Sequence, residues 1–172
     1  MIVLYEGPWN VHYGQLYLET KLGQQAEDMS DHFADQANGL VGAAVPGALF
    51  LITGLHTGHI ALRVELHESC PPIDDLWEDV VEASLHIAPP AQLVEWSAAS
   101  MHSLNIPEGN YRVRWSARGM DAGHDADTIL ADESHVDSYL LQLWLGEPLP
   151  DVVIRQTSAQ AKYWHESLGH QR

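Results

Sequence analysis

Apolar side chains that alternate with a period of two are the feature that most constrains the fold of this chain. From His59 to Glu68, positions 60, 62, 64 and 66 are apolar, and the positions between them are mostly polar or charged. The same alternation runs through Trp77–Ile87 and Tyr111–Arg118. Because successive side chains of a strand point to opposite faces of a sheet, each segment is predicted to be a strand with one buried and one solvated face. Such one-sided strands are typical of antiparallel sheets.

Further apolar runs, bounded by Gly and Pro, predict additional strands at Val11–Glu19, Ala48–Thr53, Leu93–Ser97 and Tyr139–Leu145. Helical patterns are confined to Gln24–Gln36 and to Ser158–Ser167, where Ser158 is placed to cap the helix. Length and a hydrophobic content of 45% allow a substantial core in one unit. The fold class predicted is therefore mainly β, a single-domain antiparallel β-sandwich with a short C-terminal helix, the domain spanning residues 1–172.

Acidic residues give the chain a net charge of -16. Val64–Glu82 holds seven acidic side chains, and Asp121–Asp137 holds six, with no Lys or Arg in either run. Six Trp, six Tyr and two Phe are more apolar anchors than a disordered acidic tail carries. A folded surface with this charge repels DNA, RNA and anionic lipid, and it attracts basic proteins or cations.

Metal and catalytic patterns are weak. His56, His59 and His67 could supply nitrogen ligands, but His59 and His67 are eight residues apart, which is about 26 Å along a strand. The Asp121–Glu133 run departs from the calcium-loop pattern, because Gly123 replaces a ligand and Ala126 replaces the turn glycine. No catalytic residue, metal site or cofactor is predicted.

The location predicted by default is cytoplasmic. The segment from Met1 to Trp9 lacks the basic and apolar regions of a secretory signal. No window reaches the roughly 18 consecutive apolar residues that a membrane helix needs. The lone cysteine, Cys70, excludes an intramolecular disulfide and is interpreted as an incidental loop thiol.

Four segments follow one another in the same order as in the competence protein J family of bacteria. They are His12–Leu18, Gly47–Thr53, Trp77–Glu82 and Leu104–Arg114. The sequence resembles that family over about residues 10–118, and Tyr139–Trp164 lies outside the resemblance. The family includes a small acidic cytoplasmic inhibitor of the DNA-entry nuclease. The resemblance therefore implies a β-sandwich with a protein-binding role.

We accordingly expect an acidic cytoplasmic protein-binding module, an inhibitor or immunity-type partner of a basic nuclease or toxin. An acidic protein can occupy the electropositive cleft of a nuclease with fast, electrostatically steered association. Nucleic acid and membranes are not expected as partners, whereas an uncovered sheet edge would favour a homodimer. The predicted partner-binding patch consists of Glu65, Asp74, Asp75, Glu78, Asp79 and Glu82.

Other interpretations of the same residues stay open. The acids can serve solubility alone, and Glu78 and Glu82 can pair across strands with Arg63, Arg112 or Arg114. The alternative function is a small-ligand- or metal-binding β-sandwich, or an enzyme that uses His and carboxylate side chains. An aromatic surface for a sugar or small ligand would use Tyr13, Tyr17 and Trp96.

Overall fold

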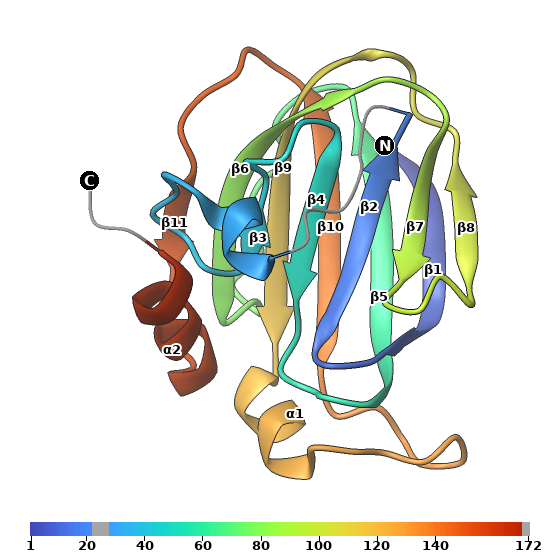
Figure 1. The fold of residues 1–172 in the computed structure, drawn as a ribbon, viewed down its shortest axis with the longest axis vertical. Coiled ribbons are helices and arrows are strands. Elements are labelled where there is room, and N and C mark those ends of the chain that lie inside the picture. The colour runs from blue at the N-terminus through green and yellow to red at the C-terminus, as the bar shows by residue number, and fades with distance from the viewer. Residues whose placement is uncertain (22–27, 170–172) are drawn as a thin grey trace.

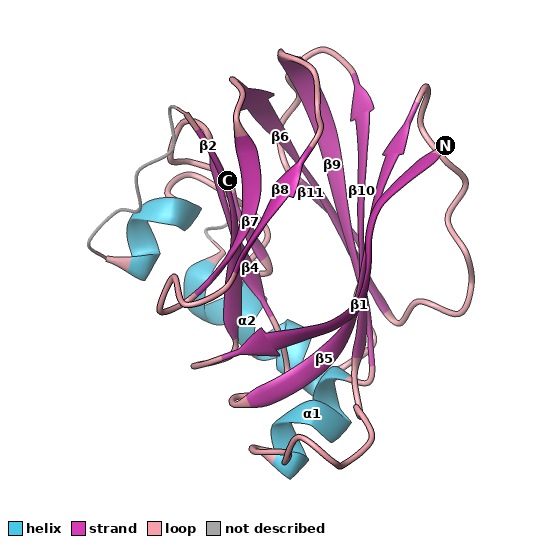
Figure 2. Ribbon diagram, turned by 90° about the vertical axis from the view of Figure 1, so that its right-hand side faces the viewer, coloured by secondary structure: helices cyan, strands magenta, loops and turns pink. Residues whose placement is uncertain are grey.

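Two β-sheets packed face to face form the protein, in a computed structural model that describes residues 1–21 and 28–169 (Figure 2). Along the chain the elements are β1 (Ile2–Val11), β2 (Gln15–Thr20), the 3-10 helix η1 (Met29–Phe33), β3 (Val41–Gly42), β4 (Ala48–Ile52), β5 (Gly58–His67), β6 (Asp79–Ile87), β7 (Ala91–Glu95), β8 (Met101–Leu104), β9 (Gly109–Arg118), α1 (Met120–Ala126), β10 (Ser138–Leu145), β11 (Val152–Arg155) and α2 (Ala159–Leu168). The prediction of a mainly β sandwich with a C-terminal helix is confirmed.

The larger sheet has six strands in the order β1-β5-β10-β9-β6-β11, and the smaller has five in the order β3-β4-β2-β7-β8 (Figure 1). The three segments with the clearest alternation became β5, β6 and β9. In both sheets, every pair of neighbouring strands is antiparallel except β5 and β10, which are parallel. The sheets are therefore mainly antiparallel, as the sequence predicts, with one parallel pair.

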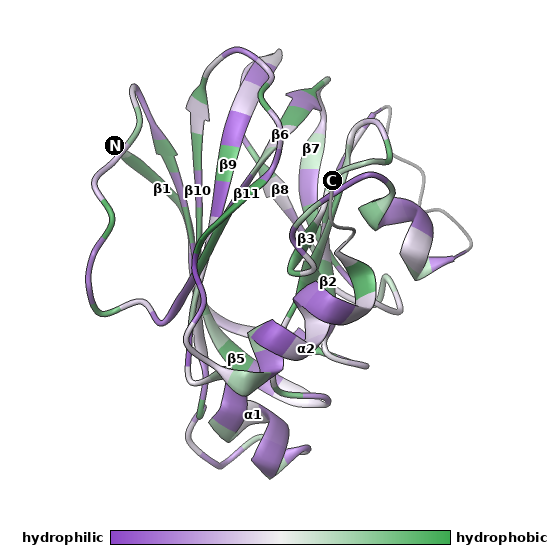
Figure 3. Cartoon of the chain, turned by 90° about the vertical axis from the view of Figure 1, so that its left-hand side faces the viewer, coloured by the Kyte–Doolittle hydropathy of each residue, from purple (hydrophilic) through white to green (hydrophobic). Residues whose placement is uncertain are grey.

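The core lies between the sheets, and hydrophobic residues run along the strands that enclose it, whereas α1 and α2 are largely hydrophilic (Figure 3). Trp115 of β9 stacks on Tyr139 of β10 with ring centroids 4.9 Å apart. The indole Nε1 of Trp115 also donates a hydrogen bond of 3.1 Å to the carbonyl of Ile52 in β4. A single buried side chain thus ties the two sheets together.

Two predicted elements differ from the structure, and one helix was not predicted. The expected strand Val11–Glu19 is broken by a turn, so that its residues belong to the end of β1 and to β2. The expected helix Gln24–Gln36 lies partly outside the described residues, and its described part contains η1. Helix α1 was not predicted, because it lies outside both segments that have a helical pattern. The expected C-terminal helix is confirmed as α2, with Ser158 Oγ accepting a hydrogen bond from Ala161 N.

Among the described residues, no helix combines the length and apolar character needed to span a bilayer.

Candidate functional site

The six predicted partner-binding acids do not form one exposed patch. Asp74 and Asp75 are exposed and Glu78 is partly buried. Glu65 is only 7% exposed, and Asp79 is fully buried. The expectation that all six face solvent is therefore wrong for Glu65 and Asp79. Glu65 lies on the outer face of the six-stranded sheet, which is covered at this point, whereas Asp79 shares the inward face of Val81 and is buried against the residues before α2.

Glu82 is held by two arginines of the neighbouring strand. Its carboxylate lies 3.1 Å from Arg112 Nη2 and 2.8 Å from Arg114 Nη2. The side chains of both arginines are nearly buried, at 6% and 3% exposure, because residues of two connecting segments lie over them. Arg114 Nη1 donates to the carbonyl of Pro71, and Arg112 Nη1 donates to that of Leu149. Cross-strand pairing, one of the alternatives for Glu82, is the arrangement found.

Glu65 lies at the centre of a second polar cluster on the same face. It accepts hydrogen bonds from Arg63 Nε at 2.6 Å and from Gln142 Nε2 at 3.0 Å, and it contacts His67 Nε2 at 2.8 Å. Burial by itself would raise the pKa of Glu65, but the bonds to Gln142, His67 and Arg63 outweigh it and lower the pKa. The carboxylate is thereby kept ionised as part of the fold.

Asp79 and Glu78 bind backbone N–H groups. Asp79 Oδ1 accepts from Thr157 N at 2.7 Å and from Ser158 N at 3.0 Å, just before α2 begins. Glu78 Oε2 accepts from Gly119 N at 2.7 Å. These carboxylates satisfy donors that would otherwise lack partners at a helix start and a turn, so their first role is structural.

Asp74 and Asp75 belong to an exposed loop, Asp74–Trp77. Arg155 of β11 holds this loop in place by hydrogen bonds. Arg155 Nη1 donates to the carbonyls of Asp74 at 3.3 Å and Trp77 at 2.7 Å, and Arg155 Nη2 donates to Asp75 Oδ1 at 2.8 Å. Leu76, between the acids and Trp77, is 66% exposed. The loop therefore presents two carboxylates and a large apolar side chain on an ordered backbone.

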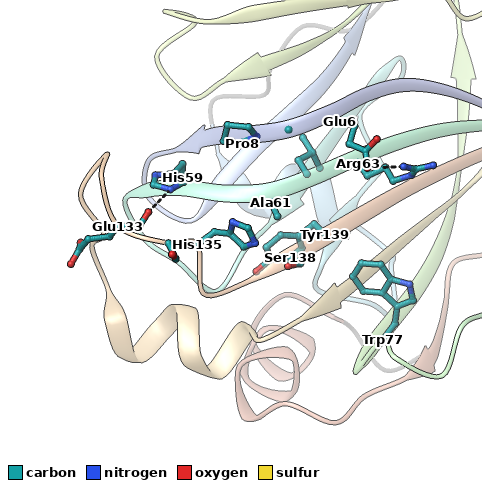
Figure 4. A pocket seen from close by; sticks show the side chains of 13 residues that line it. Glu6, Pro8, His59, Ala61, Arg63, Trp77, Glu133, His135, Ser138 and Tyr139 are labelled. Carbon is teal, nitrogen blue, oxygen red and sulfur yellow. Dashed lines mark hydrogen bonds and ion pairs between the residues drawn. The ribbon is translucent and has the colours of Figure 1, made fainter.

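Trp77 also lines a groove that crosses the outer face of β5 and β10. The groove consists of two adjoining hollows of about 530 Å³ and 540 Å³, which share Arg63 and Trp77. In the first hollow, Arg63 and Trp77 lie toward one end and His59 and Glu133 toward the other (Figure 4). This groove, with the Asp74–Trp77 loop at its edge, is the candidate functional site.

Arg63 is the charged centre of the groove, but its charge is balanced. Its Nη1 lies 2.7 Å from Glu6 Oε1, and its Nε lies 2.6 Å from Glu65 Oε1. Both hydrogen bonds raise the pKa of Arg63. An anionic ligand would have to displace one of these carboxylates, so the groove is poorly suited to binding phosphate.

The three candidate metal-ligating histidines lie in different places. His59 and His67 line different hollows of the groove, and His56 lies near Tyr13. Within residues 1–21 and 28–169, no group of three or more His, Cys, Asp or Glu side chains is arranged to hold a metal ion. The second acidic run likewise contributes to the fold: Asp121 accepts from the backbone at the start of α2, and Asp137 is buried against Tyr139.

No protein-family model matches the sequence, and no curated protein matches it. Solved structures with a similar architecture include ComJ from Bacillus subtilis, described as an inhibitor of the DNA-degrading activity of NucA. The fold resembles that of ComJ. The two chains are 17% identical with a TM-score of 0.58, and the match covers 84% of this chain and 98% of ComJ.

A second similar structure is the product of crocagin biosynthetic gene J. It is 16% identical with a TM-score of 0.55, and the match covers 85% of this chain and 98% of that one. Both matches cover more of the chain than residues 10–118, to which the sequence resemblance is limited. At these identities the matches establish a shared fold.

Proposed function

We propose that this protein binds a DNA-degrading enzyme and inhibits it. The observation that carries the proposal is the structural match to ComJ, which covers 98% of that inhibitor of NucA. The match extends over nearly the whole of that inhibitor, so the two proteins share their overall framework. The identity of the partner is inferred by analogy of fold.

The distribution of charge supports a basic partner. The net charge is -16, and two of the eight Lys and Arg residues, Arg112 and Arg114, are buried in the sheet. Arg63, Arg155 and Lys162 are engaged in ion pairs with acids. Much of the positive charge is thus neutralised within the protein, and the acids at the surface dominate its field. A nuclease cleft must be electropositive to hold phosphates, and it would attract this surface.

The Asp74–Trp77 loop is the contact that we assign to the partner. Of the six predicted acids, Asp74 and Asp75 are the exposed ones. Leu76 is exposed, and Trp77 lines the groove beside them. Interfaces favour a buried apolar or aromatic anchor with charged groups at its edge. Because Arg155 already orders the loop, little conformational entropy would be lost on binding.

The test is an assay of DNA degradation by purified NucA with increasing amounts of this protein, at low and at high salt. We expect inhibition at low salt that weakens at high salt, because the attraction between exposed charges is screened. An absence of inhibition and of binding at both salt concentrations would contradict the proposed function.

Matched variants test the loop separately. Asp75→Asn removes the charge but keeps a side-chain oxygen that can accept from Arg155 Nη2, and it should weaken binding by about threefold or more if the acid faces the partner. Glu147→Gln, which makes the same charge change at another exposed acid, should leave binding nearly unchanged. Leu76→Ala should also weaken binding, with Leu145→Ala as the control, since the two leucines are 66% and 60% exposed. Equal effects within each pair would show that the loop is not the contact. Charge reversal at Asp79 or Glu82 would disrupt the fold, so such variants cannot test the contact with the partner.

Small-ligand binding is the second candidate function, and the size of the groove favours it. Each hollow, at about 530–540 Å³, lies within the range of roughly 300–1,000 Å³ that is typical of ligand sites. A screen of metals and metabolites for an increase in Tm tests this candidate. A ligand that binds in the groove should lose its effect in Trp77→Ala, and a screen without a stabilising compound would count against this function.

A further inference from the structure

Exposed aromatic side chains meet at one end of the sandwich, outside the groove. The β1–β2 turn, the β4–β5 connection and α1 lie at this end (Figure 1). The ring of Tyr13 lies 4.7 Å from that of Trp96 and 5.3 Å from that of His56, measured between centroids. Tyr13 and Trp96 are 59% and 45% exposed. Tyr17, which the sequence grouped with them, is buried in the core and does not contribute.

Two hollows of about 350 Å³ and 470 Å³ lie beside these rings and share Tyr13, Gly14 and Trp164. We call Tyr13, His56, Trp96 and Trp164 the aromatic site. It is built from the β1–β2 turn, the β4–β5 connection, the residue after β7 and helix α2. Four separate parts of the chain thus bring aromatic rings to one place.

The backbone at Tyr13 is in a conformation that disfavours a large side chain. Tyr13 has φ 58° and Gly14 has φ 64°, and His12 and Gln15 are bridged across the turn. Positive φ at both central residues defines a type I′ turn, for which Asn-Gly is the preferred pair. Gly14 fits this preference, but a tyrosine at the first position is strained. Strain that is retained at an exposed position is a sign that the side chain itself has a role.

The surroundings of the rings favour a positively charged ligand. Asp127 and His124 of the α1 region line the larger hollow together with Gln160 of α2. None of the described residues that line either hollow is Lys or Arg. Aromatic ring faces are electron-rich, and the protein carries a net charge of -16. The rings and the net charge therefore both attract a cation. A neutral sugar would stack on the rings but would gain nothing from the charge.

We propose that the aromatic site binds an arginine side chain of a basic protein segment, with the planar guanidinium stacked on Tyr13 and Trp96 and close to the Asp127 carboxylate. Arginine is favoured over lysine because its guanidinium is flat and less strongly hydrated. The proposal rests on the proposed function for the nature of the partner. The chain from Asp127 to His135 runs from the aromatic site to the groove, so one partner would be able to reach both.

The test measures binding of an oligoarginine peptide by NMR titration, with an oligocitrulline peptide of the same length as the neutral control. We expect the arginine peptide to shift the resonances of Tyr13, His56 and Trp96, and the citrulline peptide to bind much more weakly. Equal binding of both peptides, or shifts confined to other parts of the surface, would overturn the proposal.

Two variants at position 13 separate the role of the ring from the stability of the fold. Tyr13→Asn removes the ring and creates the preferred turn pair, so affinity for the peptide should fall by about fivefold while the Tm rises. Tyr13→Phe keeps an aromatic face and should retain the affinity within about twofold. An unchanged affinity in Tyr13→Asn would overturn the proposal, and its raised Tm would exclude misfolding as the cause of any loss.

The outcome for this site can be distinguished from that for the proposed function. Peptide binding that depends on Tyr13, in a protein that does not inhibit the nuclease, would support the aromatic site and contradict the proposed function. Nuclease inhibition that needs no more of the Tyr13→Asn variant than of the wild type would overturn the site as a partner contact and leave the proposed function intact.

Discussion

The guanidinium of Arg114 lies 2.8 Å from the carboxylate of Glu82, with only 3% and 13% of these side chains exposed. The same guanidinium lies 5.1 Å from the centre of the Trp144 ring. An acid that belongs to the most acidic run of the sequence is therefore a largely buried structural partner. The acidity of this protein has two components, one that holds the fold and one that remains at its surface.

Glu82→Gln is predicted to destabilise the protein by about 3–5 kcal/mol, because it leaves the charges of Arg112 and Arg114 buried without a counter-ion. The free energy of unfolding, measured by urea denaturation, checks this prediction. Glu166→Gln is the control: its ion pair with Lys162 is exposed on α2, and its loss should cost less than about 1 kcal/mol. Similar losses for the two variants would show that the outer face of the sheet is well hydrated.

The strands of the larger sheet could be predicted from sequence because their alternation is regular. Residues 60, 62 and 64 of β5 are buried as expected, and Val113 and Trp115 of β9 are in the core. The covering of the outer face could not be predicted in the same way. It depends on Pro71 and Leu149, whose carbonyls bind arginines about 40 residues away in the chain. Local periodicity carries no information about such contacts.

The turn at Tyr13 and helix α1 were missed for local reasons. Gly14 is a turn signal, but tyrosine at the preceding position is unlike the preferred Asn, so the segment was interpreted as one continuous strand. Helix α1 has only seven residues and follows Gly119, which provides no side-chain cap. The exposed Asp74 and Asp75 and the buried Asp79 are close in sequence. Their difference arises from distant partners, Arg155 for the loop and the start of α2 for Asp79.

Asp121→Ala is predicted to destabilise the protein by about 1 kcal/mol. The Asp121 carboxylate accepts hydrogen bonds from Ala159 N at 3.1 Å and Gln160 N at 2.9 Å, so it ties α1 to the first turn of α2. Asp125→Ala, at an exposed acid of the same helix, removes an equal charge and should change stability by less than about 0.5 kcal/mol. Thermal denaturation of both variants provides the comparison. A larger effect at Asp125 would mean that net charge, rather than the capping contact, determines the loss.

His165 is predicted to make the stability of the fold fall in mild acid. Its Nδ1 accepts a hydrogen bond of 2.9 Å from Gly39 N, so the neutral imidazole is the form that fits. Burial lowers the pKa of His165, and the charges of Asp79 and Asp151 oppose this effect only in part. Burial also lowers the pKa of His32. Both histidines therefore bind a proton more readily in the unfolded chain than in the folded protein.

The sign of the pH dependence follows from this difference. As the pH falls below about 6.5, the ordinary pKa of histidine, the unfolded chain takes up protons first, and the free energy of unfolding decreases by at most about 1.4 kcal/mol per pH unit for each histidine. The decrease ends once the pH is below the folded-state pKa. Asp137 acts in the opposite direction, because burial raises its pKa and the folded state then gains stability from protonation.

The comparison between wild type and His165→Gln cancels the contribution of Asp137, which is the same in both proteins. The Gln amide oxygen can still accept from Gly39 N, so urea denaturation from neutral pH to about pH 5 should give a shallower loss of stability for the variant. Parallel curves for the two proteins would show that His165 does not couple folding to protonation.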